Sequence, residues 1–237
     1  MNIKFLLTLL LISVNIFSQQ QENKETDSFE VKIDNTFFLL GTLNDYMGRK
    51  FVVKGEIFDR YFQNERPLMQ FVDSIVKNEF GITMTEDKYC LNSEIMSKKM
   101  NSFYSENNLI DSLFSSKEKK VSFLLGAYYR YGEKVNDNIY KIRMANSFKH
   151  IQIQQFLLSL GCKNVYYKRL DNIPVQNTIY FEANELIKKY FQKVEVEKEK
   201  LFQSQFEYLK DKKITREDLI KEMNKNDYKI IEFFNQK

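Results

Sequence analysis

The chain has 237 residues, and its 36 Lys and Arg against 32 Asp and Glu give a net charge of +4 at pH 7. Only seven glycines and two prolines accompany 14 tyrosines and 21 phenylalanines, which favours long helices and argues against an all-β sandwich with its many tight turns. One histidine and two cysteines are too few for a zinc site built from these residues, and we expect neither a metal nor a cofactor.

The first 18 residues have the layout of a Sec-type signal peptide. Lys4 precedes an apolar run from Phe5 to Phe17, and Ser18 precedes a run of glutamines. The run is shorter than the roughly 20 residues of a spanning helix, and no cysteine near it could take a lipid anchor. We therefore expect cleavage after Ser18, a flexible leader over 19–30 and a soluble periplasmic or secreted protein; an uncleaved anchor is the alternative.

Charge is distributed unevenly along the rest of the chain. Residues 117–170 carry 11 Lys and Arg against 3 Asp and Glu, whereas 20–116 carry 11 against 16. The basic character therefore lies in one middle block. We divide the chain into a helical N-terminal part, 31–114, and an α+β part, 115–237, unless both belong to one continuous domain.

The N-terminal part shows two clear helix patterns. "DNTFFLLGTLNDYMG" offers N-cap residues from Asp34 and ends at Gly48, and "RPLMQFVDSIVKNEFG" has Pro67 near its first helical position and Gly81 just past its end. Residues 82–114 hold helical fragments broken by Asn and Ser, and are interpreted as a helical connector.

The second part alternates between helical and strand patterns. A helix begins near Ser115, the strand "IYKIRMAN" follows, and a helix over about 147–160 leads to the strands "VYYKRL" and "TIYFEA". From Asn184 the chain is helical and highly charged. The predicted class is α+β, mostly helical, with a small antiparallel sheet in a helix-hairpin-helix-hairpin-helix order and long charged C-terminal helices.

The two cysteines, Cys90 and Cys162, are candidates for a disulfide, since an isolated pair in an exported protein usually bonds. The alternative is two free buried thiols.

The segment "FLLG" occurs twice, at 38–41 and at 123–126. When the two copies are superposed, further identical residues coincide: Tyr46 falls on Tyr131, and "QF" at 70–71 falls on "QF" at 155–156. The segments that lie between these matches differ, because the first copy has a mostly helical pattern where the second has that of a hairpin. Coincidence due to composition is therefore preferred to duplication. A glycine inside an amphipathic helix costs about 1 kcal/mol relative to alanine, which indicates close packing of another backbone.

"LLGAYYRYG" resembles the LAGLIDADG motif of homing endonucleases, and the following elements resemble that family's αββαββα core in order. The resemblance implies helices paired through their glycines and a saddle-shaped sheet that carries basic residues to DNA. The family's metal-binding acid aligns with Tyr131, and with Tyr46 in the first copy. Because tyrosine cannot replace a carboxylate ligand of Mg²⁺, a nuclease is excluded and the resemblance is taken as one of element order.

The basic block supplies the candidate ligand-binding residues. Strand patterns place Lys141 and Arg143 on one strand, and Tyr167, Lys168 and Arg169 on another. If the strands are neighbours with one open face, cations and tyrosines would line it. An ordinary solvated strand face is the alternative.

Other patterns assign no chemistry. The sequence lacks "HExxH", "GxSxG", "CxxC" and a Gly-rich phosphate loop, and His150 near a helix start suits a surface or capping role. We therefore expect an exported, non-catalytic binding or interaction module. The alternatives are a metal-independent hydrolase using carboxylates and a binder of anionic polymers, and the expected partner is such a polymer or another exported protein.

Overall fold

The structure is a computed structural model that describes residues 32–49, 55–171, 173–210, 214–225 and 227–236. The expected signal peptide and leader lie outside the described residues. Residues Ile33–Lys237 form one compact unit. Across the described ranges, no helix combines the length and the apolar character needed to cross a membrane.

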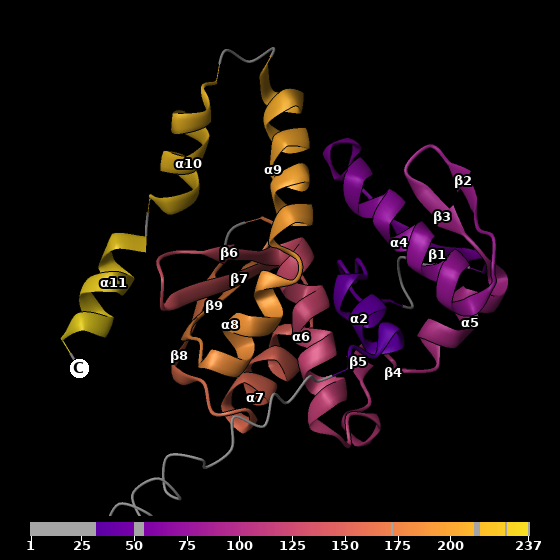
Figure 1. The fold of residues 1–237 in the computed structure, drawn as a ribbon, viewed down its shortest axis with the longest axis horizontal. Coiled ribbons are helices and arrows are strands. Elements are labelled where there is room, and N and C mark those ends of the chain that lie inside the picture. Colours follow the sequence, from indigo (N-terminus) through magenta and orange to yellow (C-terminus); the bar gives the residue numbers. More distant parts are fainter. Residues whose placement is uncertain (1–31, 50–54, 172, 211–213, 226, 237) are drawn as a thin grey trace, which may run out of the picture. The chain divides into compact units, whose positions relative to one another are not determined.

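The first half of the chain folds into helices around a three-stranded antiparallel sheet (Figure 1). Its strands lie in the order β1-β3-β2. The elements are α2 (Asn35–Thr42), β1 (Ile57–Arg60), the 3-10 turn η1 (Gln63–Glu65), α4 (Arg66–Phe80), β2 (Thr85–Asp87), β3 (Cys90–Asn92), α5 (Glu94–Asn101), β4 (Tyr104–Ser105), β5 (Asn108–Leu109) and η2 (Asp111–Leu113).

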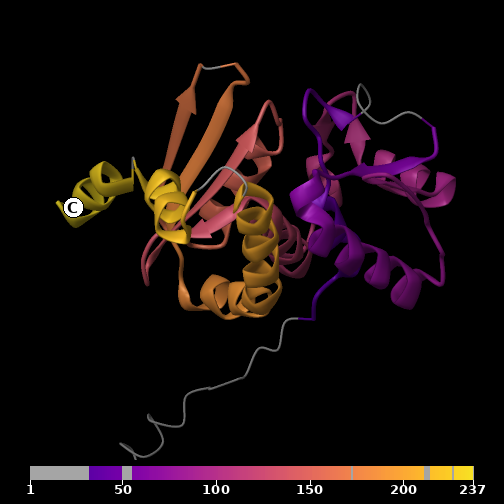
Figure 2. The ribbon, with the colours of Figure 1, turned by 90° about the horizontal axis from the view of Figure 1, so that it is seen from above.

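The second half contains a four-stranded antiparallel sheet in the order β6-β7-β9-β8. Figure 2 shows the β8–β9 hairpin extending from this sheet, with the C-terminal helices beside it. The elements are α6 (Lys117–Tyr131), β6 (Gly132–Lys134), β7 (Ile139–Ala145), α7 (His150–Ser159), β8 (Lys163–Leu170), β9 (Gln176–Glu182), α8 (Glu185–Gln192), α9 (Glu195–Leu209), α10 (Arg216–Asn224) and α11 (Asp227–Asn235).

Side-chain caps fix where the main helices begin. The Asp34 carboxylate accepts hydrogen bonds from the amides of Thr36 and Phe37 at the start of α2, and Ser116 accepts one from Lys119 at the start of α6. These bonds satisfy amides that have no partner within the helix. Gly81 ends α4 at φ +66°, a left-handed conformation that glycine adopts without strain.

The predicted α+β class is confirmed. The N-terminal part is nevertheless not purely helical, because β2 and β3 lie inside the segment interpreted as a helical connector. Those strands have three residues each, too few for a visible alternation of apolar and polar residues.

The predicted disulfide is wrong, since Cys90 and Cys162 are both free. Cys90 lies in β3 of the first sheet, whereas Cys162 is buried directly after α7 in the second half. Burial raises the pKa of both thiols, which lowers their thiolate content.

The two halves repeat one topology. Strands β1, β3 and β2 stand in the same order as β7, β9 and β8, and in each half one helix precedes the sheet, one connects its strands and one follows. Corresponding elements are separated by roughly the offset that superposes the two "FLLG" segments, although at that offset β2 overlaps β8 only at its end. This shared order favours internal duplication over the coincidence expected from composition.

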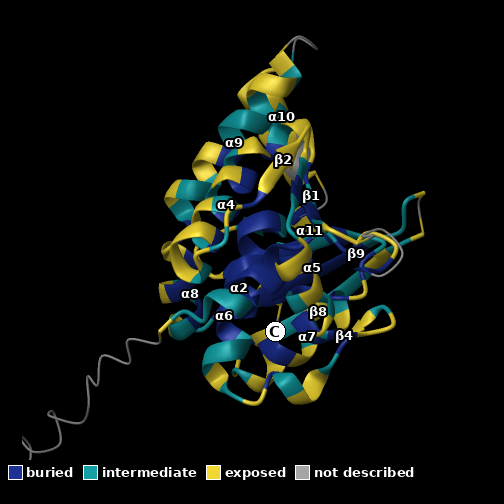
Figure 3. Ribbon diagram, turned by 90° about the vertical axis from the view of Figure 1, so that its right-hand side faces the viewer, coloured by how far each residue is buried: buried dark blue, intermediate teal, exposed yellow. Residues whose placement is uncertain are grey.

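Helices α2 and α6 pack side by side through their glycines and form the buried centre of the molecule (Figure 3). A Cβ added to Gly41 would lie 2.1 Å from the Phe123 carbonyl oxygen, and one added to Gly126 would lie 2.0 Å from that of Phe38. The backbones therefore approach as closely as glycine alone permits. The Asp34 amide, before α2, donates to Ser122, and the Arg130 guanidinium, near the end of α6, donates to the Thr42 carbonyl at the end of α2, so the helices run in the same direction.

Candidate functional site

The four-stranded sheet has one apolar and one polar face. Tyr140, Ile142 and Met144 of β7 are buried, and the Tyr140 ring contacts Tyr128 of α6 and Phe191 of α8. The alternate residues of β7 lie on the opposite face, here called the outer face. Cross-strand register defines its rows, which are Lys141–Tyr180–Tyr166, Arg143–Thr178–Lys168 and Ala145–Gln176–Leu170.

The outer face unites three of the five predicted ligand-binding residues, Lys141, Arg143 and Lys168. β7 and β8 are not neighbours, because β9 lies between them. Tyr167 is on the other face, where its hydroxyl donates to Asn177 at 2.6 Å and its ring stacks on His150 at 5.3 Å between centroids. Arg169 alternates with Lys168 and shares the face of Tyr167.

Acidic side chains hold two of these cations. The Lys141 ammonium is 2.6 Å from Asp227 of α11 and 2.8 Å from Glu133, and Arg143 is 2.9 Å from Glu133. Lys141 is almost fully buried, whereas the Arg143 side chain is about one-third exposed. Lys168 is partly exposed. The cations nearest the hairpin tip are therefore the more accessible ones.

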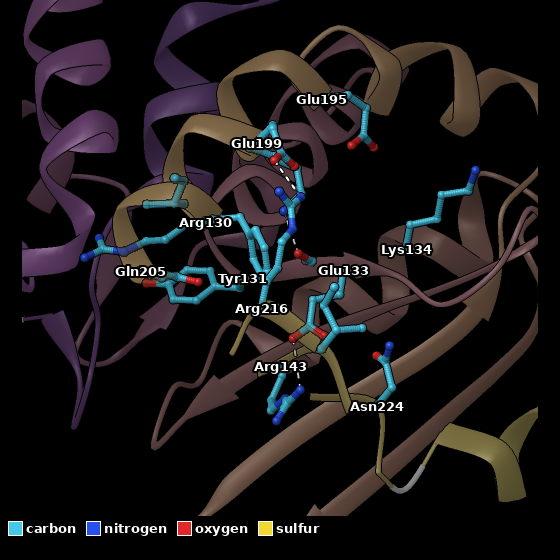
Figure 4. A pocket seen from close by; sticks show the side chains of 15 residues that line it. Arg130, Tyr131, Glu133, Lys134, Arg143, Glu195, Glu199, Gln205, Arg216 and Asn224 are labelled. Carbon is cyan, nitrogen blue, oxygen red and sulfur yellow. Dashed lines mark hydrogen bonds and ion pairs between the residues drawn. The ribbon is translucent and has the colours of Figure 1, made fainter. Parts of the chain in front are cut away.

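A cleft of about 420 Å³ lies beside this face (Figure 4). It is lined by the end of α6, by β6 and Arg143, and by residues of α9 and α10. Arg216 of α10 pairs with Glu199 at 2.8 Å across it. The cleft thus separates α10 from the edge of the sheet.

A buried ionic network joins the two repeats at the C-terminal ends of α2 and α6. The Arg130 guanidinium lies 2.8 Å from Asp59 and 2.6 Å from Glu65, and it also donates to the carbonyl oxygens of Thr42 and Arg60. Burial alone would disfavour these charges, but each has a partner of opposite sign. The sequence offers no local signal for this network, because the carboxylates lie 65 and 71 positions from Arg130.

Two lysines cap the same helix ends, Lys149 fully buried and Lys198 partly buried. The Lys149 ammonium donates to the carbonyl oxygens of Leu40, Gly41 and Leu43 at the end of α2. Lys198 of α9 does the same for three carbonyls at the end of α6, those of Tyr128, Tyr129 and Gly132. A cation is favourable there because the helix dipole places partial negative charge at its C-terminus.

These lysines predict a rise of stability with pH. Burial lowers the pKa of both Lys149 and Lys198 to about 8, below the roughly 10.4 of an unfolded lysine. From about pH 8 to 10 the unfolded chain therefore binds more protons than the folded one, and Lys149 alone adds about 1 to 2 kcal/mol. Urea unfolding at pH 8 and 9.5 measures this rise. The raised pKa values of the two thiols and of buried tyrosines act in the opposite direction over this range, so the lysine contribution is measured by comparing variants. The stability of wild type relative to Lys149→Met should increase from pH 8 to 9.5, and that relative to Lys189→Met, at an exposed site, should not; a constant difference for Lys149→Met contradicts the prediction.

Tyrosine and cations occupy the helix ends where the resemblance placed metal-binding acids. The Tyr131 hydroxyl donates to the Leu43 carbonyl at 2.9 Å, and Lys149 lies 5.1 Å from the Tyr131 ring centre. Within the described ranges, no three His, Cys, Asp or Glu side chains are grouped as metal ligands would be. The exclusion of a nuclease, which depends on these tyrosines, stays a prediction.

Comparisons with known proteins find similarity in solved structures. No family model and no curated protein matches the chain. A structure of I-DmoI in complex with DNA and Ca matches at 14% identity and a TM-score of 0.41, covering 65% of this chain and 85% of that one. A structure of mesophilic variants of the homing endonuclease I-DmoI matches at 13% identity and a TM-score of 0.41, and the match covers 67% of this chain and 93% of that one. The N-terminal LAGLIDADG domain of DUF199/WhiA matches at 14% identity and a TM-score of 0.40, and the match covers 70% of this chain and 84% of that one.

These comparisons contradict the function expected from the sequence. The matching structures are a homing endonuclease and a LAGLIDADG domain, so the exported, non-catalytic binding module is wrong, and the carboxylate hydrolase and the exported binder of an unspecified anionic polymer are withdrawn with it. The periplasmic or secreted location and the expected partners, an anionic polymer or an exported protein, are corrected by the same finding. TM-scores near 0.4 at 14% identity transfer no role from these proteins to this chain.

Proposed function

We propose that the protein binds duplex DNA through the outer face of its four-stranded sheet. The observation that carries the proposal is the row Arg143–Thr178–Lys168, in which one partly exposed cation lies on each side of the buried Thr178 across three strands. Cationic side chains neutralise phosphates. A two-stranded antiparallel ribbon fits the major groove of B-DNA, and the β8–β9 hairpin has this form.

The charge distribution supports the same face. Residues 117–170, with their excess of cations, supply β7 and β8, whereas the first sheet belongs to a segment with an acidic balance. Of the candidates chosen from the sequence, Arg143 and Lys168 would contact DNA directly. Tyr167 would act indirectly, because it braces β9 through Asn177.

Removing the two accessible cations tests the proposal. We expect Arg143→Gln with Lys168→Gln to weaken binding of a fluorescent 30-base-pair duplex about tenfold or more at low salt, and to reduce the slope of log K against log salt by about 2. Fluorescence anisotropy between 50 and 200 mM salt measures both quantities.

A charge-matched control separates the face from net charge. Lys77→Gln with Lys189→Gln removes two exposed cations from α4 and α8 and should leave affinity nearly unchanged. Equal losses in both double variants, or wild-type protein without salt-dependent binding, would refute the proposal.

A further inference from the structure

Helix α11 covers one half of the outer face. Its Asp227 accepts a hydrogen bond from the Lys141 ammonium at 2.6 Å through one oxygen, and from the Tyr180 hydroxyl at 2.9 Å through the other. All three residues are less than 5% exposed. A carboxylate thus occupies the two donors of the row next to Arg143–Thr178–Lys168, as a phosphate oxygen of DNA would.

Apolar contacts hold the helix in place. Ile230 and Phe234 pack on Ile139 and Tyr180 of the sheet. The Phe233 ring lies 5.7 Å from that of Tyr166, which continues the covered row into β8. The residues that α11 contacts therefore lie on β7, β9 and β8, in the row Lys141–Tyr180–Tyr166 and at Ile139.

The attachment of α11 is small. The buried residues of this helix are Asp227, Ile230 and Phe234. No residue of α10 whose side chain is described is buried, and the cleft of about 420 Å³ lies between α10 and the edge of the sheet. A helix held by so few side chains can detach without disturbing the core, which is built on α2 and α6.

We propose that α11 is an intramolecular competitor of DNA, with Asp227 in the place of a phosphate, and that its detachment exposes Lys141 and Tyr180 to the duplex. This regulation rests on the proposed function of the same face. Bound DNA and docked α11 exclude one another, so each weakens the other by the same factor.

Variants that release the helix without changing charge test this competition. We expect Ile230→Ser with Phe234→Ser to bind the 30-base-pair duplex at least fivefold more tightly than wild type, because the cost of detaching α11 is removed. Tyr228→Ser is the control, since that side chain is about half exposed on the same helix and should change little.

A second pair of variants tests the Asp227 carboxylate, and both variants have the same net charge. Asp227→Asn and Glu232→Gln each remove one negative charge from α11, but Glu232 is exposed and is not the partner of Lys141. Asp227→Asn should strengthen DNA binding more than Glu232→Gln. Equal effects would show that charge alone acts, and would overturn the competition.

Hydrogen exchange of residues 227–235 distinguishes the two proposals. Faster exchange in Ile230→Ser with Phe234→Ser than in wild type reports release of α11 whether or not DNA binds. Release with unchanged DNA affinity overturns the competition and leaves DNA binding intact. Release without DNA binding in either protein overturns the proposed function itself. Faster exchange of α11 in wild type on addition of DNA supports both.

Discussion

Gly126→Ala is expected to destabilise the protein by about 3 kcal/mol or more, the upper range for overpacking a core. The added methyl carbon would lie 2.0 Å from the Phe38 carbonyl oxygen, and the obstacle is backbone, which no rotamer change can move. Helix propensity works in the opposite direction, because alanine is favoured over glycine by about 1 kcal/mol inside a helix. Urea unfolding gives the difference in free energy.

Gly81→Ala serves as the control for this prediction. A Cβ at Gly81 meets nothing within 4 Å, so the cost there is limited to its positive φ, about 1 kcal/mol. If Gly126→Ala proved neutral or stabilising, the close approach of α2 and α6 would be disproved. Because Gly41 meets Phe123 in the same manner, Gly41→Ala should reproduce the loss.

Arg130→Met should cost about 3 to 5 kcal/mol, since it leaves Asp59 and Glu65 buried without their main partner. Methionine keeps much of the volume of the arginine side chain. The loss of unfolding free energy therefore measures the missing charge more than the effect of a cavity. Adding Glu65→Gln to this variant should recover part of the stability, because it removes the carboxylate that has lost its partner, whereas Asp59 keeps Arg49 at 3.7 Å. Urea unfolding of the single and double variants measures the coupling.

An exposed pair supplies the comparison. Arg216 and Glu199 lie 2.8 Å apart with both side chains about half exposed, and such pairs contribute about 0 to 1 kcal/mol. Arg216→Met should therefore change stability little. A similarly small loss for Arg130→Met would mean that the network does not hold the repeats together.

The sequence pattern predicted the second half well for a physical reason. Three of its strands, β7, β8 and β9, have seven or eight residues, long enough for alternation to show, and Ser116 and Asn184 cap the starts of α6 and α8. The three-residue strands β2 and β3 offered no such period. The strand order that the two halves share depends on the first sheet, and strands this short leave no period in the sequence from which that order could be predicted.

Three of the candidate ligand-binding residues lie on one face of the sheet, and their role in binding stays a prediction. Lys141, Arg143 and Lys168 were chosen from the basic block, and they share one face. The contact of Asp227 with Lys141 spans 86 positions and cannot be read from local spacing. Tyr167 and Arg169 were grouped with Lys168 because they are adjacent in sequence, but neighbours along a strand point to opposite faces.

By itself, the sequence determined the α+β class, the periods of the longer strands and helices, and the position of the basic block. These depend on contacts between residues a few positions apart. Only the tertiary structure decided that the two "FLLG" glycines meet, that Arg130 joins both repeats, that the cysteines stay apart and that α11 covers half of the outer face. Each of these joins residues tens of positions apart, where packing and charge pairing in three dimensions select the partners.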